Sequence, residues 1–302
     1  MRFNENESGA EGAMNKSSVF FVVFAAFCWG LNGVWSRTLS SAGLSFFELN
    51  AARSLIAVLC VFIFLFIADR KAVRINIKDV WLFVFTGGFG YALCYVCYFY
   101  TATILTLSAT TILIYTAPYM VMLISAFAFK ERVTMRKAAA LLIAFAGCVM
   151  TIGVIGNTNF PVKGILSGLT AAFLYSLYTI FSKVAMRKYK PITVAAYSFL
   201  TACIVLLPFC SLGNAMTVLA ESANWARALV FGALFTALPS VSYLKGLEKL
   251  EPGRASIIAF VEPLTAAAAG IVLYDEMLSA IKITGIALIF LALVLLNWER
   301  AE

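Results

Sequence analysis

Long apolar stretches, each about the length of a membrane-spanning helix, follow one another along almost the whole chain. A span across the hydrocarbon core of a bilayer needs roughly 20 mostly apolar residues. Because the apolar residues run continuously and do not alternate with polar ones, the pattern predicts helices and not the strands of a β-barrel. Ten stretches qualify: 18–38, 46–67, 80–102, 107–129, 137–155, 163–185, 192–211, 226–246, 254–273 and 280–297.

The composition agrees with this pattern. Hydrophobic residues make up 62% of the 302 residues, and the mean hydropathy is +0.93, whereas soluble proteins are about 45–50% apolar. The fold class is therefore an all-α membrane protein with ten transmembrane helices. We expect it to be a multi-pass protein of the inner (cell) membrane, with the lipid bilayer as its surroundings.

Lysine and arginine are distributed unevenly among the connections between spans. With a cytoplasmic N-terminus, 18 of the 23 Lys and Arg residues lie on the cytoplasmic side, four lie on the other side, and Arg53 lies inside a span. Because cytoplasmic loops of membrane proteins are enriched in these residues, both termini are predicted to be cytoplasmic. The net charge of +8 then reflects loop runs such as 70–78, 130–137 and 183–190, and we expect no nucleic-acid partner.

Two segments 145 residues apart share one pattern. PYMVMLISAFAFKERVT begins at Pro118 and contains Glu131, and PLTAAAAGIVLYDEMLS begins at Pro263 and contains Glu276. In each segment the proline and the glutamate bracket an apolar helix. An internal repeat in a membrane chain is typical of transporters built from two related halves around a central path.

Five spans per half is an odd number, so the second half must enter the membrane inverted relative to the first. We divide the chain into a polar cytoplasmic tail, 1–17, a first five-helix repeat, 18–155, and a second, inverted repeat, 163–297. The tail lacks the basic region of a signal peptide, and the first apolar run is predicted to be retained as a span. Inverted repeats provide two mirror-related states, one open to each side.

In these features the chain resembles EamA-type members of the drug/metabolite transporter superfamily. The resemblance rests on FCWGLNGVWSR in the first span, on Arg53 in the second, on YTATILTLSATTILIYTAPYMVMLISAFAFKERVT across the third and fourth, and on YLKGLEKLEPGRASIIAFVEPLTAAAAGIVLYDEMLS across the eighth and ninth. One departure is Asp275, where many members have Gly, and we expect it to affect a loop.

The resemblance implies two inverted five-helix bundles and the export or exchange of small metabolites. Similar proteins carry amino acids, nucleobases, sugars or quaternary amines. It also implies a central cavity lined mainly by the first, third, fourth, sixth, eighth and ninth spans.

Two charged residues lie within predicted spans. Glu262 sits about halfway along the ninth span, where a carboxylate costs about 2.5–3.5 kcal/mol on insertion scales. It is interpreted as a proton-coupling residue or as the holder of a substrate ammonium. The structural alternatives are hydrogen bonds from backbone freed by Pro263, or an ion pair with Arg53. For Arg53, an ion pair with Glu262 or Glu48, outward snorkelling and binding of a substrate carboxylate remain open.

Polar and aromatic side chains in the spans expected to line the cavity are the candidate substrate-binding residues. Aromatic faces stack on flat substrates and attract cations, although core packing explains such residues equally well. The candidates are Trp29, Asn32, Tyr95, Tyr98, Tyr115, Tyr175, Tyr178 and Ser242.

Three prolines, Pro118, Pro239 and Pro263, lie inside predicted spans. Each removes a helical hydrogen bond and bends its helix. They are interpreted either as hinges of the two halves or as static kinks.

We therefore expect no enzyme but a secondary active transporter, which exports a small polar metabolite, an amino acid or organic amine, by alternating access. Protons are the candidate coupling ion. Alternatives are a facilitator or exchanger of nucleobases or sugars, an integral-membrane lipid-modifying enzyme, and a scaffold or receptor without transport. Cys94 and Cys97 form a CxxC among aromatic residues, in a chain without histidine, and are interpreted as core packing. No cofactor and no metal site are expected.

Overall fold

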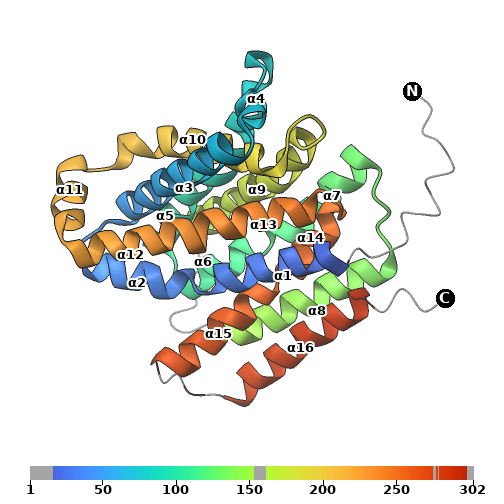
Figure 1. The fold of residues 1–302 in the computed structure, drawn as a ribbon. Helices are drawn as coiled ribbons and strands as arrows, with labels where there is room; N and C mark the ends of the chain where they lie inside the picture. Colours follow the sequence, from blue (N-terminus) through green and yellow to red (C-terminus); the bar gives the residue numbers. More distant parts are fainter. Residues whose placement is uncertain (1–15, 153–160, 275–276, 278, 298–302) are drawn as a thin grey trace.

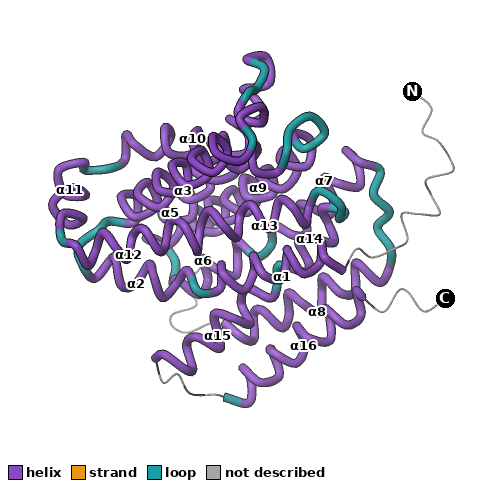
Figure 2. The backbone as a smooth tube through the Cα atoms, viewed as in Figure 1, coloured by secondary structure: helices purple, strands orange, loops and turns teal. Residues whose placement is uncertain are grey.

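The computed structural model describes residues 16–152, 161–274, 277 and 279–297. Nearly all of these residues are helical, and no strand occurs among them (Figure 2). Nine helices in the described ranges are long and apolar enough to cross a membrane, and Ala280–Leu296 is a shorter apolar helix. The prediction of ten helical spans is confirmed. Residues 1–15 of the predicted tail, Asp275 and Glu276 lie outside the described residues.

Three spans of the first half are divided or locally irregular, and the other two, α3 and α8, are continuous. The first span divides into α1 and α2, the fourth into α6 and α7, and the third contains a π-helical stretch. The helices are α1 (Lys16–Gly30), α2 (Asn32–Ser41), α3 (Phe46–Ala68), α4 (Val80–Phe83), the π-helical Val84–Leu93, α5 (Cys94–Ile104), α6 (Leu107–Ile114), α7 (Ala117–Phe129) and α8 (Met135–Ile152).

The second half repeats this arrangement in part. The ninth span divides into α14 and α15, as the fourth does, and the eighth contains a π-helical stretch, as the third does. The helices are α9 (Val162–Ala185), α10 (Pro191–Leu206), α11 (Leu212–Ala220), α12 (Ser222–Gly232), the π-helical Ala233–Ala237, α13 (Leu238–Leu247), α14 (Pro252–Ile258), α15 (Val261–Tyr274) and α16 (Ala280–Asn297).

The two halves interlock, because the main contacts pair a helix of one half with a helix of the other. α1 packs against α13, α5 against α9, α3 against α10, and α8 against α16; Figure 1 shows α8 and α16 side by side. The equivalent pairs, first with eighth span and third with sixth, follow the inverted repeat.

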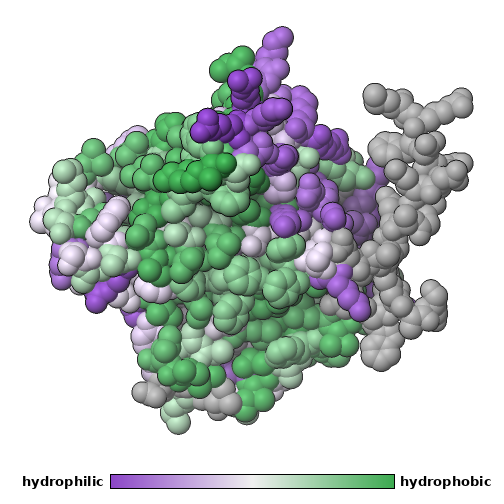
Figure 3. Space-filling view, viewed as in Figure 1, coloured by the Kyte–Doolittle hydropathy of each residue, from purple (hydrophilic) through white to green (hydrophobic). Residues whose placement is uncertain are grey.

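Apolar side chains cover much of the face seen in Figure 3, and hydrophilic residues gather towards the end that holds α4 and the end of α7. Among the described residues, several large apolar side chains are highly exposed, such as Phe127 at 87% and Ile67 at 82%. Such exposure would be unfavourable in water and is expected for a surface that faces lipid. The chain is a multi-pass membrane protein.

Candidate functional site at the middle of the membrane

The interruption of the ninth span places Glu262 at a helix N-terminus. α14 ends at Ile258 and α15 begins at Val261, and the Glu262 N–H donates to the Ala259 carbonyl at 2.9 Å. A carboxylate in the first turn of a helix interacts favourably with the helix dipole. The sequence located Glu262 in mid-span correctly, but it did not show that the helix restarts there.

A glycine lets the first span approach this point closely. A Cβ added to Gly30 would lie 2.6 Å from the Glu262 carbonyl oxygen and 2.5 Å from the Thr265 Cβ. Gly30 is also the last residue of α1. Both helix interruptions therefore meet at the same level, which is the arrangement used by transporters with substrate sites at the bilayer midplane.

The Glu262 side chain faces several other spans while remaining partly exposed. The Tyr115 hydroxyl lies beside the carboxylate, and the Arg53 charge acts on it. Tyr98 and Tyr175 also lie within the electrostatic reach of Glu262. The carboxylate is therefore partly exposed and has side chains of four other spans as electrostatic neighbours.

Arg53 lies beside Tyr95 and is only 4% exposed. Its Nη2 donates to the Tyr95 hydroxyl at 2.5 Å. Its Cζ lies 4.9 Å from the Tyr95 ring centroid and 5.3 Å from that of Phe231, distances typical of cation–π contacts. The predicted alternatives of an ion pair with Glu48 or Glu262 are wrong for the described residues, because no carboxylate there lies within 4.0 Å of Arg53. Burial also excludes outward snorkelling.

Glu48 has a structural role instead. It forms a capping box with Ser45 at the start of α3, and it accepts a hydrogen bond from Asn214 of α11 at 2.7 Å. These hydrogen bonds satisfy the Glu48 carboxylate at the helix N-terminus. Glu48 is therefore stable without an ion pair to Arg53. The short helix α11 was not predicted.

Three of the predicted substrate-binding residues, Tyr98, Tyr115 and Tyr175, lie within the electrostatic reach of Glu262, and Trp29 directly precedes Gly30, which approaches the Glu262 backbone. Trp29 packs against Tyr243 with ring centroids 5.2 Å apart, and Tyr115 stacks on Phe260 at 5.7 Å. Tyr178 and Ser242, at 6% and 7% exposure, lie behind the accessible side chains in this conformation. The accessible members of the set are Trp29, Asn32, Tyr95, Tyr98, Tyr115 and Tyr175, all partly exposed.

Each predicted hinge proline follows an interruption directly. Pro118 lies in the first turn of α7 and Pro239 in the first turn of α13, after the π-helical stretch. Pro263 is the third residue of α15. A proline at these positions lacks an N–H that would have no helical partner in any case. The structure therefore locates the prolines where two helix segments meet, and their hinge role stays a prediction.

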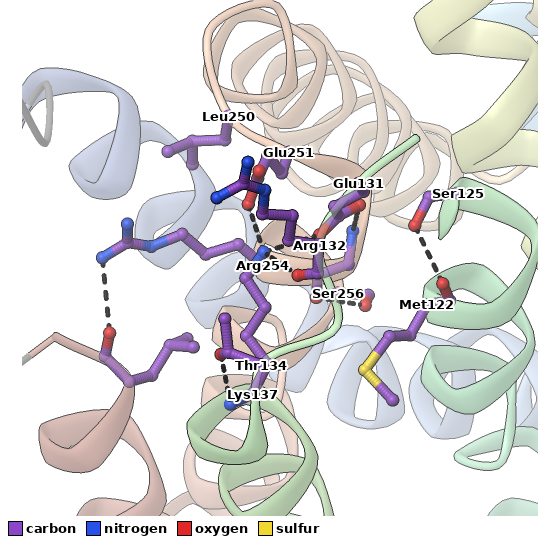
Figure 4. A network of polar contacts seen from close by, with 12 residues as sticks. Met122, Ser125, Glu131, Arg132, Thr134, Lys137, Leu250, Glu251, Arg254 and Ser256 are labelled. Atoms are coloured by element: carbon purple, nitrogen blue, oxygen red, sulfur yellow. Dashed lines mark hydrogen bonds and ion pairs between the residues drawn. The ribbon is translucent and has the colours of Figure 1, made fainter. Parts of the chain in front are cut away.

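A network of charged groups joins the fourth and ninth spans at the end that carries the basic loops (Figure 4). The Lys137 ammonium lies 3.2 Å from Glu131 and 2.5 Å from Glu251, and it also donates to the Arg132 carbonyl at 3.0 Å. Glu131 accepts from the Gly253 N–H of α14 at 3.2 Å. The sequence interpreted the run 130–137 as a topology signal only; Lys137 is in fact 7% exposed.

A second lysine, Lys183, links the sixth and eighth spans at the same end of the bundle. The Lys183 ammonium donates to the carbonyls of Leu247, Glu248 and Leu250 at 2.7–3.0 Å. These carbonyls terminate α13, where a cation is favourable. In contrast, α6 and α15, the outer halves of the fourth and ninth spans, make almost no contact with each other, although their inner halves α7 and α14 pack together.

Comparisons with known proteins agree with this architecture. The EamA-like transporter family model matches residues 16–153 and again residues 162–298. The chain belongs to the EamA-like transporter family. As a family member it is a membrane transporter of the drug/metabolite type, and the resemblance inferred from the sequence motifs is confirmed.

Individual relatives share the full length of this family member. It is 28% identical over 282 residues to the uncharacterized transporter YwfM of Bacillus subtilis, covering 92% of each chain. It is 24% identical over 286 residues to the pseudopaline exporter CntI of Pseudomonas aeruginosa, covering 93% of this chain and 96% of the relative. A solved crystal structure with 19% identity superposes with a TM-score of 0.78 over 93% of this chain and 96% of the other.

Proposed function

We propose that this family member is a secondary active transporter that moves a small polar metabolite by alternating access, with an amino acid or organic amine as cargo and export as its direction. One observation carries the proposal. Charged and aromatic side chains gather at midspan, and the fourth and ninth spans around them pack together at one end but not at the other; we take the space between them as the cargo cavity.

The sealed end is the cytoplasmic end in this proposal. The start of α1, the end of α16 and the loops with most lysine and arginine residues lie at the same end of the bundle, and the distribution of these residues favours a cytoplasmic location. The structure then corresponds to an outward-facing state, and the Lys137 network is the cytoplasmic gate. A reporter fused after residue 302 is expected to read as cytoplasmic.

Glu262 is proposed to couple transport to protons. It is the carboxylate that lines the cavity, and histidine is absent from the chain. Arg53 assists it as the opposing charge. Pro118, Pro239 and Pro263 lie where helix segments meet, so they are proposed to be the hinges across which the inner and outer halves move.

Flux in proteoliposomes tests this proposal. Purified protein is reconstituted, and uptake of a labelled amino-acid mixture is measured with and without a pH gradient. Flux that increases with the gradient supports proton-coupled transport. Gradient-independent flux indicates a facilitator or exchanger, and folded protein without flux of amino acids, amines, nucleobases or sugars contradicts a transport function.

A further inference from the structure

The hydroxyl of Tyr95 is a hydrogen-bond donor whose direction is fixed by Arg53. The guanidinium donates to the Tyr95 oxygen and has no acceptor of its own. The Tyr95 proton must therefore point elsewhere, and no acceptor for it is found among the described residues. Since Tyr95 is partly exposed, this proton is available to a ligand, and the neighbouring cation strengthens the bond that it donates.

Two neighbouring tyrosine hydroxyls, those of Tyr98 and Tyr115, face groups of the protein. The Thr111 hydroxyl donates to the Leu107 carbonyl at 2.8 Å, so Tyr98, 3.0 Å from Thr111, must donate to that oxygen. The Tyr115 hydroxyl lies against Glu262. The Tyr95 hydroxyl differs from both, because it accepts from the Arg53 guanidinium and is therefore a stronger donor to an anionic group.

Glu262 is the candidate partner for a positively charged group. We call Tyr95, with Arg53 behind it, and Glu262 the two poles of the site. The Glu262 carboxylate is accessible, and no lysine or arginine of the described chain lies within 4.0 Å of it. It accepts hydrogen bonds and carries negative charge, which suits an ammonium group.

Tyr95 and Glu262 both lie near the same two aromatic side chains. Tyr98 and Tyr175 lie within the electrostatic reach of both poles, and their rings provide apolar walls between them.

We infer that the cavity binds a zwitterion, whose carboxylate is bound by Tyr95 with Arg53 behind it and whose ammonium is bound by Glu262. The inference rests on the proposed transport function and requires both charges on the cargo. An amine without a carboxylate leaves Arg53 uncompensated in a buried position, and an acid without an ammonium brings a second anion towards Glu262. Both arrangements are unfavourable, because a buried charge needs a partner.

A matched set of three ligands tests the inference. Counterflow in proteoliposomes first selects the standard amino acid with the largest signal. That amino acid then competes against its decarboxylated amine and its deaminated acid. We expect the amine and the acid to bind at least about tenfold more weakly, since each loses a hydrogen bond to a charged group.

Variants of Tyr95 and Arg53 test whether this pole produces the preference for the amino acid over the amine. Tyr95→Phe keeps the ring and is expected to weaken amino-acid binding about tenfold while the affinity for the amine is unchanged. Arg53→Gln is also expected to lose the preference for the amino acid over the amine, since Arg53 is a positioning residue that acts through Tyr95. Tyr100→Phe, on the same helix but 53% exposed, is the matched control and is expected to keep the preference.

Three results would overturn the inference. One is an amine that competes as well as the amino acid against the unaltered protein. Another is an unchanged preference in both folded variants. The third is counterflow of a cargo without opposite charges and of no amino acid, which would leave the proposed transport function intact. Folded protein with no counterflow of any cargo would overturn both.

Discussion

Lys137 and Arg53 are both buried cations, and their surroundings differ completely. Lys137, at 7% exposure, is held by two carboxylates and a backbone carbonyl. Arg53, at 4% exposure, is held by one phenol oxygen and aromatic rings. A buried charge is stable when its partners are complete. The partners of Lys137 are therefore complete within the protein, whereas Arg53 and its partner Tyr95 can still interact with a ligand.

The same difference separates two carboxylates. Glu131 accepts from Lys137 and from the Gly253 N–H, and its side chain is 2% exposed. Glu262 is accessible and faces tyrosines. In the proposed function, the charges at the cytoplasmic end hold one conformation together, and the charges at midspan serve the cargo and the coupling ion.

The largest effect is expected at Glu262. Glu262→Gln should abolish flux driven by a pH gradient and spare exchange, because a carboxamide cannot take up and release the coupling proton. Gradient-driven uptake and counterflow measured on the same vesicles separate the two activities. Glu248→Gln, exposed at the cytoplasmic end, is the control. Loss of folding in Glu262→Gln would instead indicate a structural role.

Removal of Lys137 should destabilise the conformation described here. Lys137→Met leaves the Glu131 carboxylate buried without its cation, and breaking a buried pair in this way costs about 3–5 kcal/mol. Thermal unfolding in detergent measures the loss. The double variant Lys137→Met/Glu131→Gln should regain most of it.

Glu251 provides a graded comparison within the same network. Its side chain is 51% exposed, so Glu251→Gln should cost no more than about 1 kcal/mol. A loss as large as that of Lys137→Met would contradict the distinction between the buried and the exposed partner.

A smaller effect is expected at Trp29. Trp29→Ala removes a ring on which the cargo is proposed to pack and should weaken cargo binding by up to about tenfold, because aromatic packing contributes about 0.5–1.5 kcal/mol. The same ring packs against Tyr243. Trp35→Ala removes a pair with the same 5.2 Å centroid separation, against Phe235, away from Glu262. Equal affinities in the two variants would contradict an aromatic lining of the site.

The smallest effect concerns a loop. The hydrogen bond from Lys190, at 2.5 Å, holds the pKa of Asp69 below its usual range. Because the folded-state pKa is lowered, the stabilisation is complete above the unfolded pKa of about 3.9 and is lost as the pH falls through the folded value. Asp69→Asn should therefore lower the melting temperature slightly at neutral pH and have no effect in acid. A difference that persists in acid would contradict this assignment.

The sequence predicted the ten spans because their apolar runs are long and continuous. It also located Glu262, Arg53 and the three prolines, since charges and prolines stand out in such runs. The interruption at Leu31 was not predicted, as no proline marks it. The burial of Lys137 was missed because it depends on Glu251, which is 114 residues away, and the absence of a carboxylate beside Arg53 is a property of tertiary packing.

Distances between spin labels at the two ends of the fourth and ninth spans test alternating access most directly. In a chain without its seven cysteines, labels at exposed Phe127 and Lys249 report on the cytoplasmic end. Labels at exposed Leu107 and Val272 report on the outer end. Lys137→Met should lengthen the cytoplasmic distance and shorten the outer one. Unchanged distances at both ends in folded protein would contradict a cytoplasmic gate held by Lys137.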